Sequence, residues 1–128
     1  MQICSTAGFQ PFQYLNVYAA SKAFLYRFSR ALRVELFAKG IRVTAVCPYW
    51  IRDTEFIPVA KNTGGSGKAV RHFPLSHKVS TVAAISYNDS RLGLAVSTPG
   101  IMCTLHRIAA KWIPSELMMG IWAVLRRL

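Results

Sequence analysis

The chain has 128 residues, 52% of them hydrophobic, so it is long enough and apolar enough to bury the core of one domain. Its 16 Lys and Arg residues against five Asp and Glu give a net charge of +11, but these charges are spread along the chain without an RNA-binding aromatic motif, a zinc finger or a basic arm, which argues against nucleic acid as a partner. No window approaches about 18 apolar residues, no signal peptide is recognisable and no metal-ligand spacing is present, so we expect a cytoplasmic protein without a membrane-spanning helix or a metal.

The first half of the chain has the pattern of a strand, a helix and a second strand. Residues 1–8, MQICSTAG, read as the end of a buried strand that runs into a glycine-containing loop. Apolar residues recur at helical spacing over residues 17–39, which predicts a helix with Asn16 as its N-cap and Gly40 at its C-terminal end. The stretch IRVTAVCP, residues 41–48, predicts a strand buried on both faces, as in the parallel sheet of a βαβ unit.

The second half of the chain is predicted to contain more helix than strand. The run TGGSG reads as a loop tip and not as a phosphate-binding loop, because no hydroxyl residue follows the lysine after it. A helix capped by Ser76 is expected over residues 76–89, and a short strand within LGLAVSTPG. Residues 101–128 are expected to form two short helices divided at Pro114, with Ser115 capping the second. Four residues of the helix that begins at Ser76 are expected to face inward: Val79, Val82, Ala83 and Ser86.

Tyr18 and Lys22 are four positions apart in the first predicted helix, in the segment YAASK. Positions i and i+4 lie on one face of a helix, so the ammonium group and the phenol are neighbours. A nearby positive charge and the helix N-terminus both stabilise a phenolate, and we therefore expect the pKa of Tyr18 to be lowered from its usual value of about 10. Such a tyrosine could give a proton to a carbonyl or take one from an alcohol.

A tyrosine and a lysine at this spacing are common by chance, but two further hydroxyl residues support a functional interpretation of Tyr18 and Lys22. Ser5 precedes Tyr18 by 13 residues and ends the first predicted strand, at the edge where open α/β sheets bind ligands. Its hydroxyl could hydrogen-bond the same substrate oxygen that the tyrosine protonates. Thr54 follows the second predicted strand and its Pro48 by a few residues.

In this combination the chain resembles the short-chain dehydrogenase/reductase family. The matching segments are, in order, ICSTAG with Ser5, YAASKAF with Tyr18 and Lys22, then FSRALRVEL, GIRVTAVCP and DTEF. They cover about residues 3–57 at the family's separations, and the serine, tyrosine and lysine together are far more specific than the tyrosine–lysine pair. The resemblance implies an α/β fold with a partial Rossmann-like, doubly wound parallel sheet, and an oxidoreductase that depends on NAD or NADP.

The resemblance also implies a division of labour among the three central residues. Tyr18 would be the proton donor and acceptor in hydride transfer between the nicotinamide and a carbonyl or alcohol. Ser5 would orient the substrate oxygen. Lys22 would hold the ribose hydroxyls of the nicotinamide nucleotide and lower the pKa of the tyrosine.

Further residues are implied to bind the cofactor and the substrate. The segment after the second strand would hold the nicotinamide through backbone groups near Ile51 and through the Thr54 hydroxyl. Tyr14 and Tyr49 are candidates, with Ser5, for contact with the substrate, although packing is an equal alternative for Tyr14. Residues 56–75 would form an apolar substrate lid. The implied cofactor-binding set comprises Tyr18, Lys22, Pro48, Ile51 and Thr54.

Three departures from the family pattern are visible. Tyr49 follows Pro48 where the family usually has glycine, which puts a close backbone approach in doubt. The sequence has no Gly-rich strand-to-helix turn for the pyrophosphate and lacks the asparagine that the family often contributes from an earlier helix. We therefore expect residues 1–128 to be the C-terminal part of a single Rossmann domain with a helical tail at about 101–128, inactive by itself.

The tail and the helix that carries Tyr18 and Lys22 suggest partners. The helix has an apolar outer face that family members often pair in homo-oligomers. Aromatic and Met residues of the tail recur at helical spacing, which indicates either core packing or, with nearby basic residues, a peripheral membrane contact. The residues concerned are Trp112, Met118, Met119, Trp122, Arg107, Lys111, Arg126 and Arg127.

Several questions stay open at the level of sequence. The apolar lid favours a hydrophobic alcohol or ketone, either steroid-like or acyl-chain-like, and the choice between NAD and NADP is not determined. A non-catalytic role in oligomer assembly or at a membrane surface is the alternative function. The three histidines, His72, His77 and His106, have no partners at ligand spacing and are interpreted as incidental.

Overall fold

The computed structural model describes residues 1–55, 57–58 and 76–125. Its main sheet is parallel and has the strand order β1-β2-β5, which confirms the predicted α/β class. The three strands are short: β1 (Gln2–Ile3), β2 (Ala45–Val46) and β5 (Val96–Ser97).

The register of the sheet brings the segments after its strands together. Ile3 pairs with Val46, and Val46 pairs with Ser97, so the three strands end level with one another. Because parallel strands all end at the same edge, the residues that follow them emerge side by side there. Ser5 and Pro48 are among these residues.

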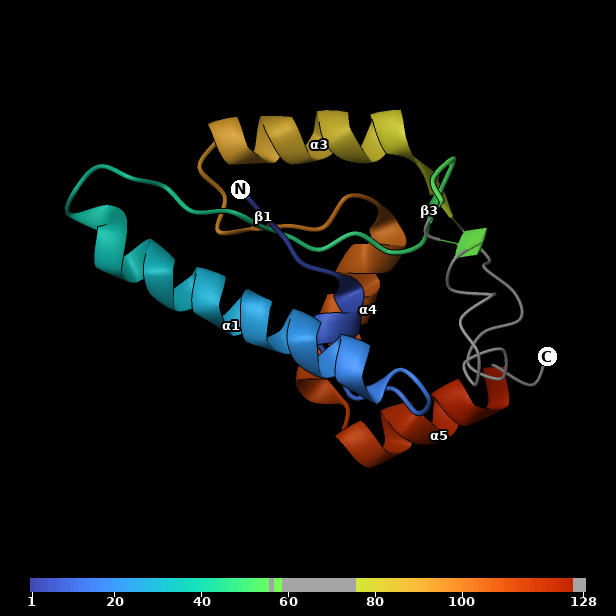
Figure 1. The fold of residues 1–128 in the computed structure, drawn as a ribbon. Helices are drawn as coiled ribbons and strands as arrows, with labels where there is room; N and C mark the ends of the chain where they lie inside the picture. Colours follow the sequence, from blue (N-terminus) through green and yellow to red (C-terminus); the bar gives the residue numbers. More distant parts are fainter. Residues whose placement is uncertain (56, 59–75, 126–128) are drawn as a thin grey trace.

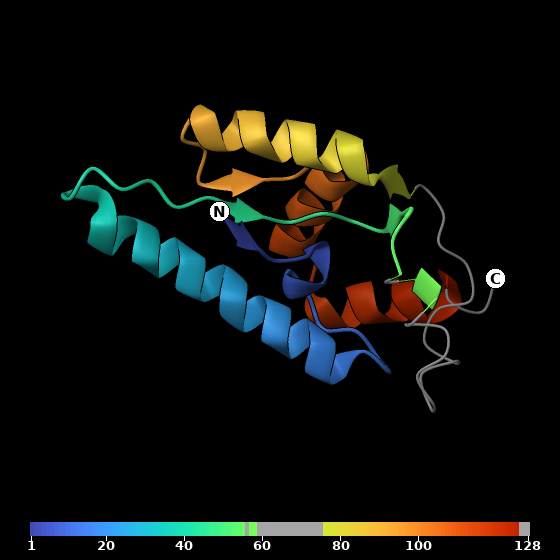
Figure 2. The ribbon, with the colours of Figure 1, turned by 45° about the horizontal axis from the view of Figure 1, so that its top comes forward.

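Two helices cover the sheet from opposite sides. Helix α1 (Asn16–Phe37) lies on one side of the strands and α3 (Val79–Arg91) on the other in both ribbon views (Figures 1 and 2). A second parallel pair, β3 (Ile51–Arg52) and β4 (His77–Lys78), lies between the end of the main sheet and the start of α3. The result is the three-layer arrangement expected of a doubly wound sheet.

Helix α1 confirms the first predicted helix but corrects its N-terminal end. Leu15 occupies the N-cap position without a side-chain hydrogen bond, and Asn16 is the first helical residue. The Asn16 side chain instead accepts a hydrogen bond from its neighbour, the backbone N–H of Val17, at 3.3 Å. At the other end Gly40 has a φ of +72°, a backbone conformation that glycine adopts without the strain of a side chain, and ends the helical run as predicted.

Helix α3 begins three residues later than predicted. Residues His77 and Lys78 are held extended by pairing with β3, so Ser76 cannot cap the helix and Lys78 takes that position. Val82 and Ser86 face inward as predicted, whereas Val79 and Ala83 are exposed. The prediction was wrong for these two because only one narrow stripe of α3 meets the sheet.

The tail confirms the predicted break at Pro114. It comprises α4 (Ile101–Trp112) and α5 (Ser115–Leu125), and Ser115 is the first residue of its helix. Trp122 is only 9% exposed and joins Ala7, Phe12 and Ala19 in a core cluster, which favours core packing for this face of α5. None of the described helices is long and apolar enough to cross a lipid bilayer.

The short 3-10 helix η1 (Thr6–Gly8) sits directly against α1. A side-chain carbon placed on Gly8 would lie 2.7 Å from the backbone oxygen of Lys22 and 2.8 Å from its carbonyl carbon. Backbone atoms of a helix cannot move aside easily, so only glycine allows this approach. Gly8 therefore sets how closely the segment that bears Ser5 packs on the helix that bears Tyr18.

Gly8→Ala should destabilise the fold by about 1–3 kcal/mol, because the added methyl group overpacks the contact with α1. Gly120→Ala is the matched control: it lies within α5, and a side-chain carbon there meets nothing within 4 Å. Helix propensity predicts that this second change stabilises the chain by about 0.5–1 kcal/mol. Urea unfolding followed by circular dichroism measures both, and equal effects of the two changes would contradict the close contact.

Candidate active site

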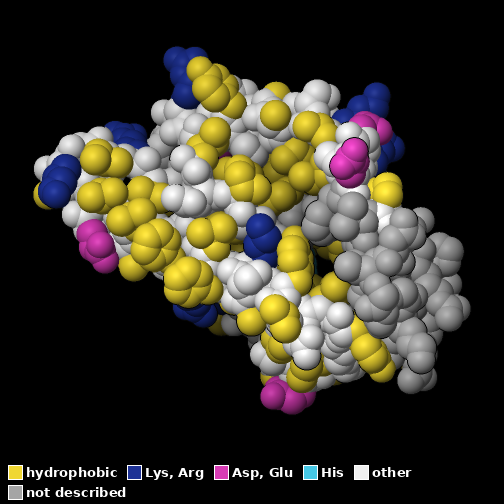
Figure 3. All heavy atoms as spheres, viewed as in Figure 1, with side chains coloured by type: hydrophobic (Ala, Val, Ile, Leu, Met, Phe, Trp, Pro, Cys, Tyr) yellow, Lys and Arg dark blue, Asp and Glu magenta, His cyan; other side chains and the backbone are white. Residues whose placement is uncertain are grey.

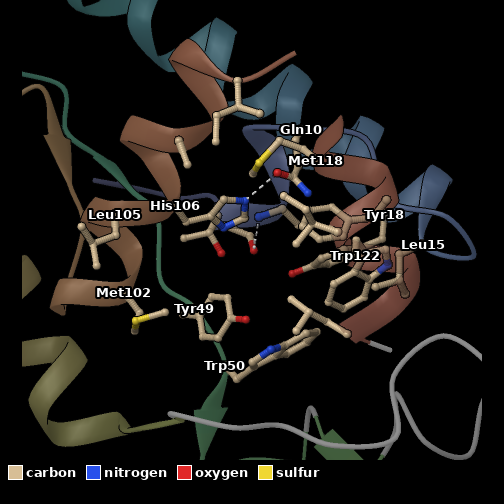
Figure 4. Close-up of a pocket in the computed structure, with 18 residues that line it drawn as sticks. Gln10, Leu15, Tyr18, Tyr49, Trp50, Met102, Leu105, His106, Met118 and Trp122 are labelled. Carbon is tan, nitrogen blue, oxygen red and sulfur yellow. Dashed lines mark hydrogen bonds between the residues drawn. The ribbon is translucent and has the colours of Figure 1, made fainter. Parts of the chain in front are cut away.

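A pocket with a volume of about 360 Å³ lies beyond the carboxyl edge of the main sheet (Figure 4). Its wall combines η1 and the loop after it, the start of α1, the residues after β2, and the helices α4 and α5. Most of the lining is apolar, and the hydroxyls of Tyr18 and Tyr49 point into the same space. Such a cavity, with a few polar groups gathered in it, has the character of a small-molecule site.

Ser5 is fixed at the end of β1 by the backbone on both sides of it. The N–H of Cys4 donates to Val46 O at 2.8 Å, and the N–H of Thr6 donates to Pro48 O at 3.0 Å. The residue is 9% exposed, and its side-chain oxygen accepts a hydrogen bond from the N–H of Ala7 at 3.1 Å, which caps η1. Because this oxygen already accepts from Ala7, the Ser5 hydroxyl has one proton to donate, either to Tyr18 or to a ligand in the pocket.

Tyr18 lies in the first turn of α1, and its side chain meets Ser5 in the pocket. A hydrogen bond joins the two hydroxyl groups, which lowers the pKa of Tyr18, but burial of the phenol has the larger effect and raises this pKa above 10.0. The expectation of a lowered pKa is therefore wrong for this structure. Removing the phenolate from water costs more free energy than the hydrogen bond from Ser5 contributes, so the phenol of Tyr18 is neutral at neutral pH.

Lys22 shares a helix face with Tyr18, as the spacing predicted, but its charge is used differently. The ammonium nitrogen lies 5.8 Å from the centre of the Tyr18 ring and donates a hydrogen bond to the backbone oxygen of Ile3 at 3.1 Å. The side chain is half-buried and does not line the pocket. Lys22 thus ties α1 to β1 from behind the tyrosine.

The structure brings some of the other predicted residues to the pocket and leaves others outside. Tyr49 lines it. Pro48 is buried at the edge of the sheet, and Ile51 lies in β3, with its backbone oxygen accepting from the Thr54 hydroxyl at 3.3 Å. Tyr14 is 52% exposed and does not line the pocket. Of the predicted lid at residues 56–75, all but residues 57–58 lie outside the described part of the chain.

The main residues that sequence reasoning missed are Gln10 and His106. His106, which the sequence indicated as incidental, lies in the pocket wall with Nε2 at 3.0 Å from Gln10 Oε1. Burial lowers the pKa of His106 below 6.5, so the ring is neutral at pH 7. The two residues are 96 positions apart, and no local pattern indicates that α4 returns to the loop before α1.

The residues near Tyr18 fit the nicotinamide end of a dinucleotide. Lys22 has three N–H donors and gives one to Ile3, which leaves two for ribose hydroxyls in a half-buried position beside the phenol. The Thr54 hydroxyl and the backbone of Ile51 lie together beyond Pro48. The described residues contain no cluster of three His, Cys, Asp or Glu side chains that could hold a metal ion.

Residues 1–63 match the model of the short chain dehydrogenase family. Over these residues, just under half of its length, the chain has the sequence of a short-chain dehydrogenase. The matched residues include Ser5, Tyr18 and Lys22, the three positions on which the resemblance was based.

Three relatives illustrate how the similarity extends along the chain. The NADP-dependent 3-hydroxy acid dehydrogenase of Escherichia coli is 41% identical over 73 residues, which cover 57% of this chain and 29% of that protein. The serine 3-dehydrogenase of Agrobacterium fabrum is 42% identical over 69 residues, 54% of this chain and 26% of that protein. The very-long-chain 3-oxoacyl-CoA reductase of Rattus norvegicus is 30% identical over 125 residues, 94% of this chain and 36% of that protein.

The chain spans about a third of the length of the curated relatives that it matches: 29% of the first, 26% of the second and 36% of the third. No solved structure gives a significant match.

His106 predicts how stability depends on pH. Its pKa is lower in the folded chain than the usual 6.5, so the unfolded chain binds more protons between the two values. The free energy of unfolding should be at its full value above about pH 7 and should fall on acidification below 6.5, by up to about 1.4 kcal/mol per pH unit from this residue. Urea unfolding from pH 8 to pH 5 measures this, and His106→Gln should flatten the curve. An identical pH dependence in both proteins would show that His106 is not the buried group responsible.

Proposed function

We propose that the chain carries the proton-transfer residues of a nicotinamide-dependent oxidoreductase that interconverts a carbonyl and an alcohol. The observation that carries this proposal is the hydrogen bond between the hydroxyls of Ser5 and Tyr18 inside the pocket. Lys22 stands behind the same tyrosine on α1. A nicotinamide cofactor, when bound, supplies or accepts the hydride.

The three residues divide the work during reduction. Ser5 and Tyr18 both direct hydroxyl protons at the substrate oxygen, which orients the carbonyl and polarises it. As negative charge develops on that oxygen, the Tyr18 proton moves to it and leaves a phenolate. The Lys22 ammonium, 5.8 Å from the ring, then stabilises the phenolate electrostatically. In the oxidative direction Tyr18 takes the proton back from the alcohol.

The raised pKa of Tyr18 supports the reductive direction at neutral pH. A phenol with a raised pKa is almost fully protonated at pH 7 and is ready to donate. Oxidation requires the phenolate, so it should become relatively faster as the pH rises. NADP, which the name of the E. coli relative specifies, is the first cofactor that we propose to assay.

The pocket supports a substrate with an apolar chain. Aliphatic and aromatic side chains from α4 and α5 form much of its wall. The names of the three relatives place their reactions at carbon 3 of a 3-hydroxy acid, a 3-oxoacyl-CoA and serine. We propose a 3-oxoacyl or 3-hydroxyacyl compound with a hydrophobic tail.

A homo-oligomer formed through α1 is a further part of the proposal. Hydrophobic side chains gather along this helix on the molecular surface (Figure 3), where Phe24 and Phe28 stack with ring centres 6.1 Å apart. Phe24 is 71% exposed and Val34 is 76% exposed. Apolar exposure of this extent suits a face that another protein surface covers. A second copy of the chain is the partner that we propose.

A second candidate role, attachment to an anionic membrane surface, is favoured by the exposed side of α4. Its exposed apolar residues recur at positions i, i+4, i+7 and i+11, the spacing of one helix face, and α4 contains no acidic residue. Two basic residues flank this stripe, and the Lys111 ammonium lies 5.5 Å from the ring of Trp112. This pattern is that of a helix lying in the membrane interface. The stripe comprises Ile101, Leu105, Ile108 and Trp112, flanked by Arg107 and Lys111.

Tyr18→Phe tests the proton-transfer role. We would use a chimera of the E. coli relative in which the matched 73-residue segment is replaced by the corresponding residues of this chain. Oxidation of NADPH by the chimera can be followed by absorbance. Tyr18→Phe in the chimera should lower kcat by roughly 10²–10⁴-fold, because proton transfer to the substrate oxygen is lost, with little change in the KM for NADPH. Tyr26→Phe, two helical turns away on α1 and packed on Phe9, is the control and should retain activity. A Tyr18→Phe chimera with undiminished kcat would refute the assignment.

Trp112→Glu tests membrane attachment. Co-sedimentation of the 128-residue chain with phosphatidylserine-containing vesicles should fall roughly tenfold in this variant and should weaken with added salt in the unaltered chain. Val34→Glu introduces the same charge at an equal 76% exposure on α1 and should leave vesicle binding unchanged. Equal losses in both variants would mean that the effect comes from net charge, and no binding by the unaltered chain would remove this candidate role.

A further inference from the structure

Gln10 and His106 form a polar pair that the proton-transfer chemistry does not use. Gln10 lies in the loop between η1 and α1, and His106 lies in α4, so the 3.0 Å bond between them joins this loop to α4 at the pocket wall. Figure 4 shows both side chains on the same side of the cavity, with the hydroxyls of Tyr18 and Tyr49 pointing into the same space.

The hydrogen bond fixes which group of Gln10 is left for a ligand. Gln10 Oε1 is the bonded atom, so the ring nitrogen Nε2 of His106 carries the proton and donates it. The amide oxygen is therefore engaged, while the amide NH₂ group remains a donor at the pocket wall. The His106 ring is itself held by edge-on contacts with Phe12 and Tyr49, at 5.9 and 6.4 Å between ring centres.

The charge of the pocket lining indicates which kind of hydrogen-bond acceptor the Gln10 amide group would bind. His106 is neutral because burial lowers its pKa, and the described residues that line the pocket include no lysine or arginine. A carboxylate entering this apolar space would lose its hydration without gaining a cation. A neutral carbonyl oxygen can be bound by one N–H of the Gln10 amide group alone.

We infer that Gln10, positioned by His106, binds a second, neutral carbonyl oxygen of the substrate, so that the pocket selects thioesters or esters of 3-oxo and 3-hydroxy acids over simple ketones and over the free acids. This inference rests on the proposed function for the first oxygen, the reacting one held by Ser5 and Tyr18. In this arrangement Gln10 determines specificity, and His106 is a positioning residue that acts through it.

Binding of three matched probes to the 128-residue chain tests the inference. The probes are the S-ethyl thioester of 3-hydroxydecanoic acid, 3-decanol, and the 3-hydroxydecanoate anion, with affinity measured by isothermal titration calorimetry and by fluorescence of the pocket residues Trp50 and Trp122. One net hydrogen bond predicts that the thioester binds about 3–10-fold more tightly than 3-decanol, with the anion weakest. Equal affinities for thioester and alcohol, or no binding of either, would overturn the inference.

Two variants assign the preference to the pair. Gln10→Leu should abolish the preference for the thioester while leaving the Kd for 3-decanol within about twofold. His106→Phe, which keeps an aromatic ring against Phe12, should reduce the preference for the thioester. Gln13→Leu, a nearby glutamine that does not line the pocket, is the control and should retain the full preference. A preference that survives Gln10→Leu would overturn the inference even if every variant folds, as circular dichroism would verify.

A separate variant distinguishes failure of this inference from failure of the proposed function. Tyr18→Phe removes a donor to the first oxygen and should weaken binding of thioester and alcohol equally, leaving their ratio unchanged. If Tyr18→Phe changes neither affinity, the proposed function fails. If it weakens both but Gln10→Leu does not alter the ratio, only the inference about Gln10 fails.

Discussion

The contact between Gly8 and the backbone of Lys22 is the constraint on which the site depends. With only hydrogen on its α-carbon, Gly8 lets η1 pack against the second turn of α1, where any side-chain carbon would lie 2.7 Å from a helix carbonyl oxygen. That approach sets Ser5, three residues earlier, against the phenol of Tyr18. Lys22 closes the same corner from the other side through its hydrogen bond to Ile3 O. The absence of a side chain at Gly8 thus allows the end of a strand and the start of a helix to pack closely together. Backbone that is hydrogen-bonded at several points can then keep the side chains it carries in a fixed geometry.

Burial, and not the neighbouring charge, determines the ground-state protonation of this tyrosine. The positive charge of Lys22 is shared with the backbone oxygen of Ile3 and lies 5.8 Å from the centre of the Tyr18 ring. The phenol oxygen faces an apolar cavity, where an anion is poorly solvated. In the proposed reaction the ammonium would matter most after the proton has left, when it would offset the charge of the phenolate. A phenol in such a site resists ionisation at rest and would give up its proton only to an oxygen that is becoming negative.

Local spacing made part of this site predictable. The i, i+4 relation of Tyr18 and Lys22 follows from helix geometry, and the place of Ser5 follows from the rule that parallel strands end at one edge. The errors arise where tertiary contacts override local signals: strand pairing of Lys78 displaces the cap from Ser76, and the phenol's pKa depends on how much of it the tail covers. The pocket's second wall was not predictable, because nothing near His106 in sequence indicates Gln10 as its partner.

The residues of the proposed proton transfer and the residues of the pocket's second wall occupy different parts of the chain. The serine, tyrosine and lysine lie within residues 1–63, which match the family model, whereas the wall that α4 and α5 supply lies beyond them. Proton transfer needs a fixed set of atoms around one substrate oxygen, and few sequences satisfy it. Substrate selection needs only shape and one or two polar groups elsewhere in the pocket, and many side chains can supply them. Gln10 and the α4–α5 pair can therefore change and alter what the pocket accepts, while η1 and α1 keep the residues of the proposed proton transfer in place.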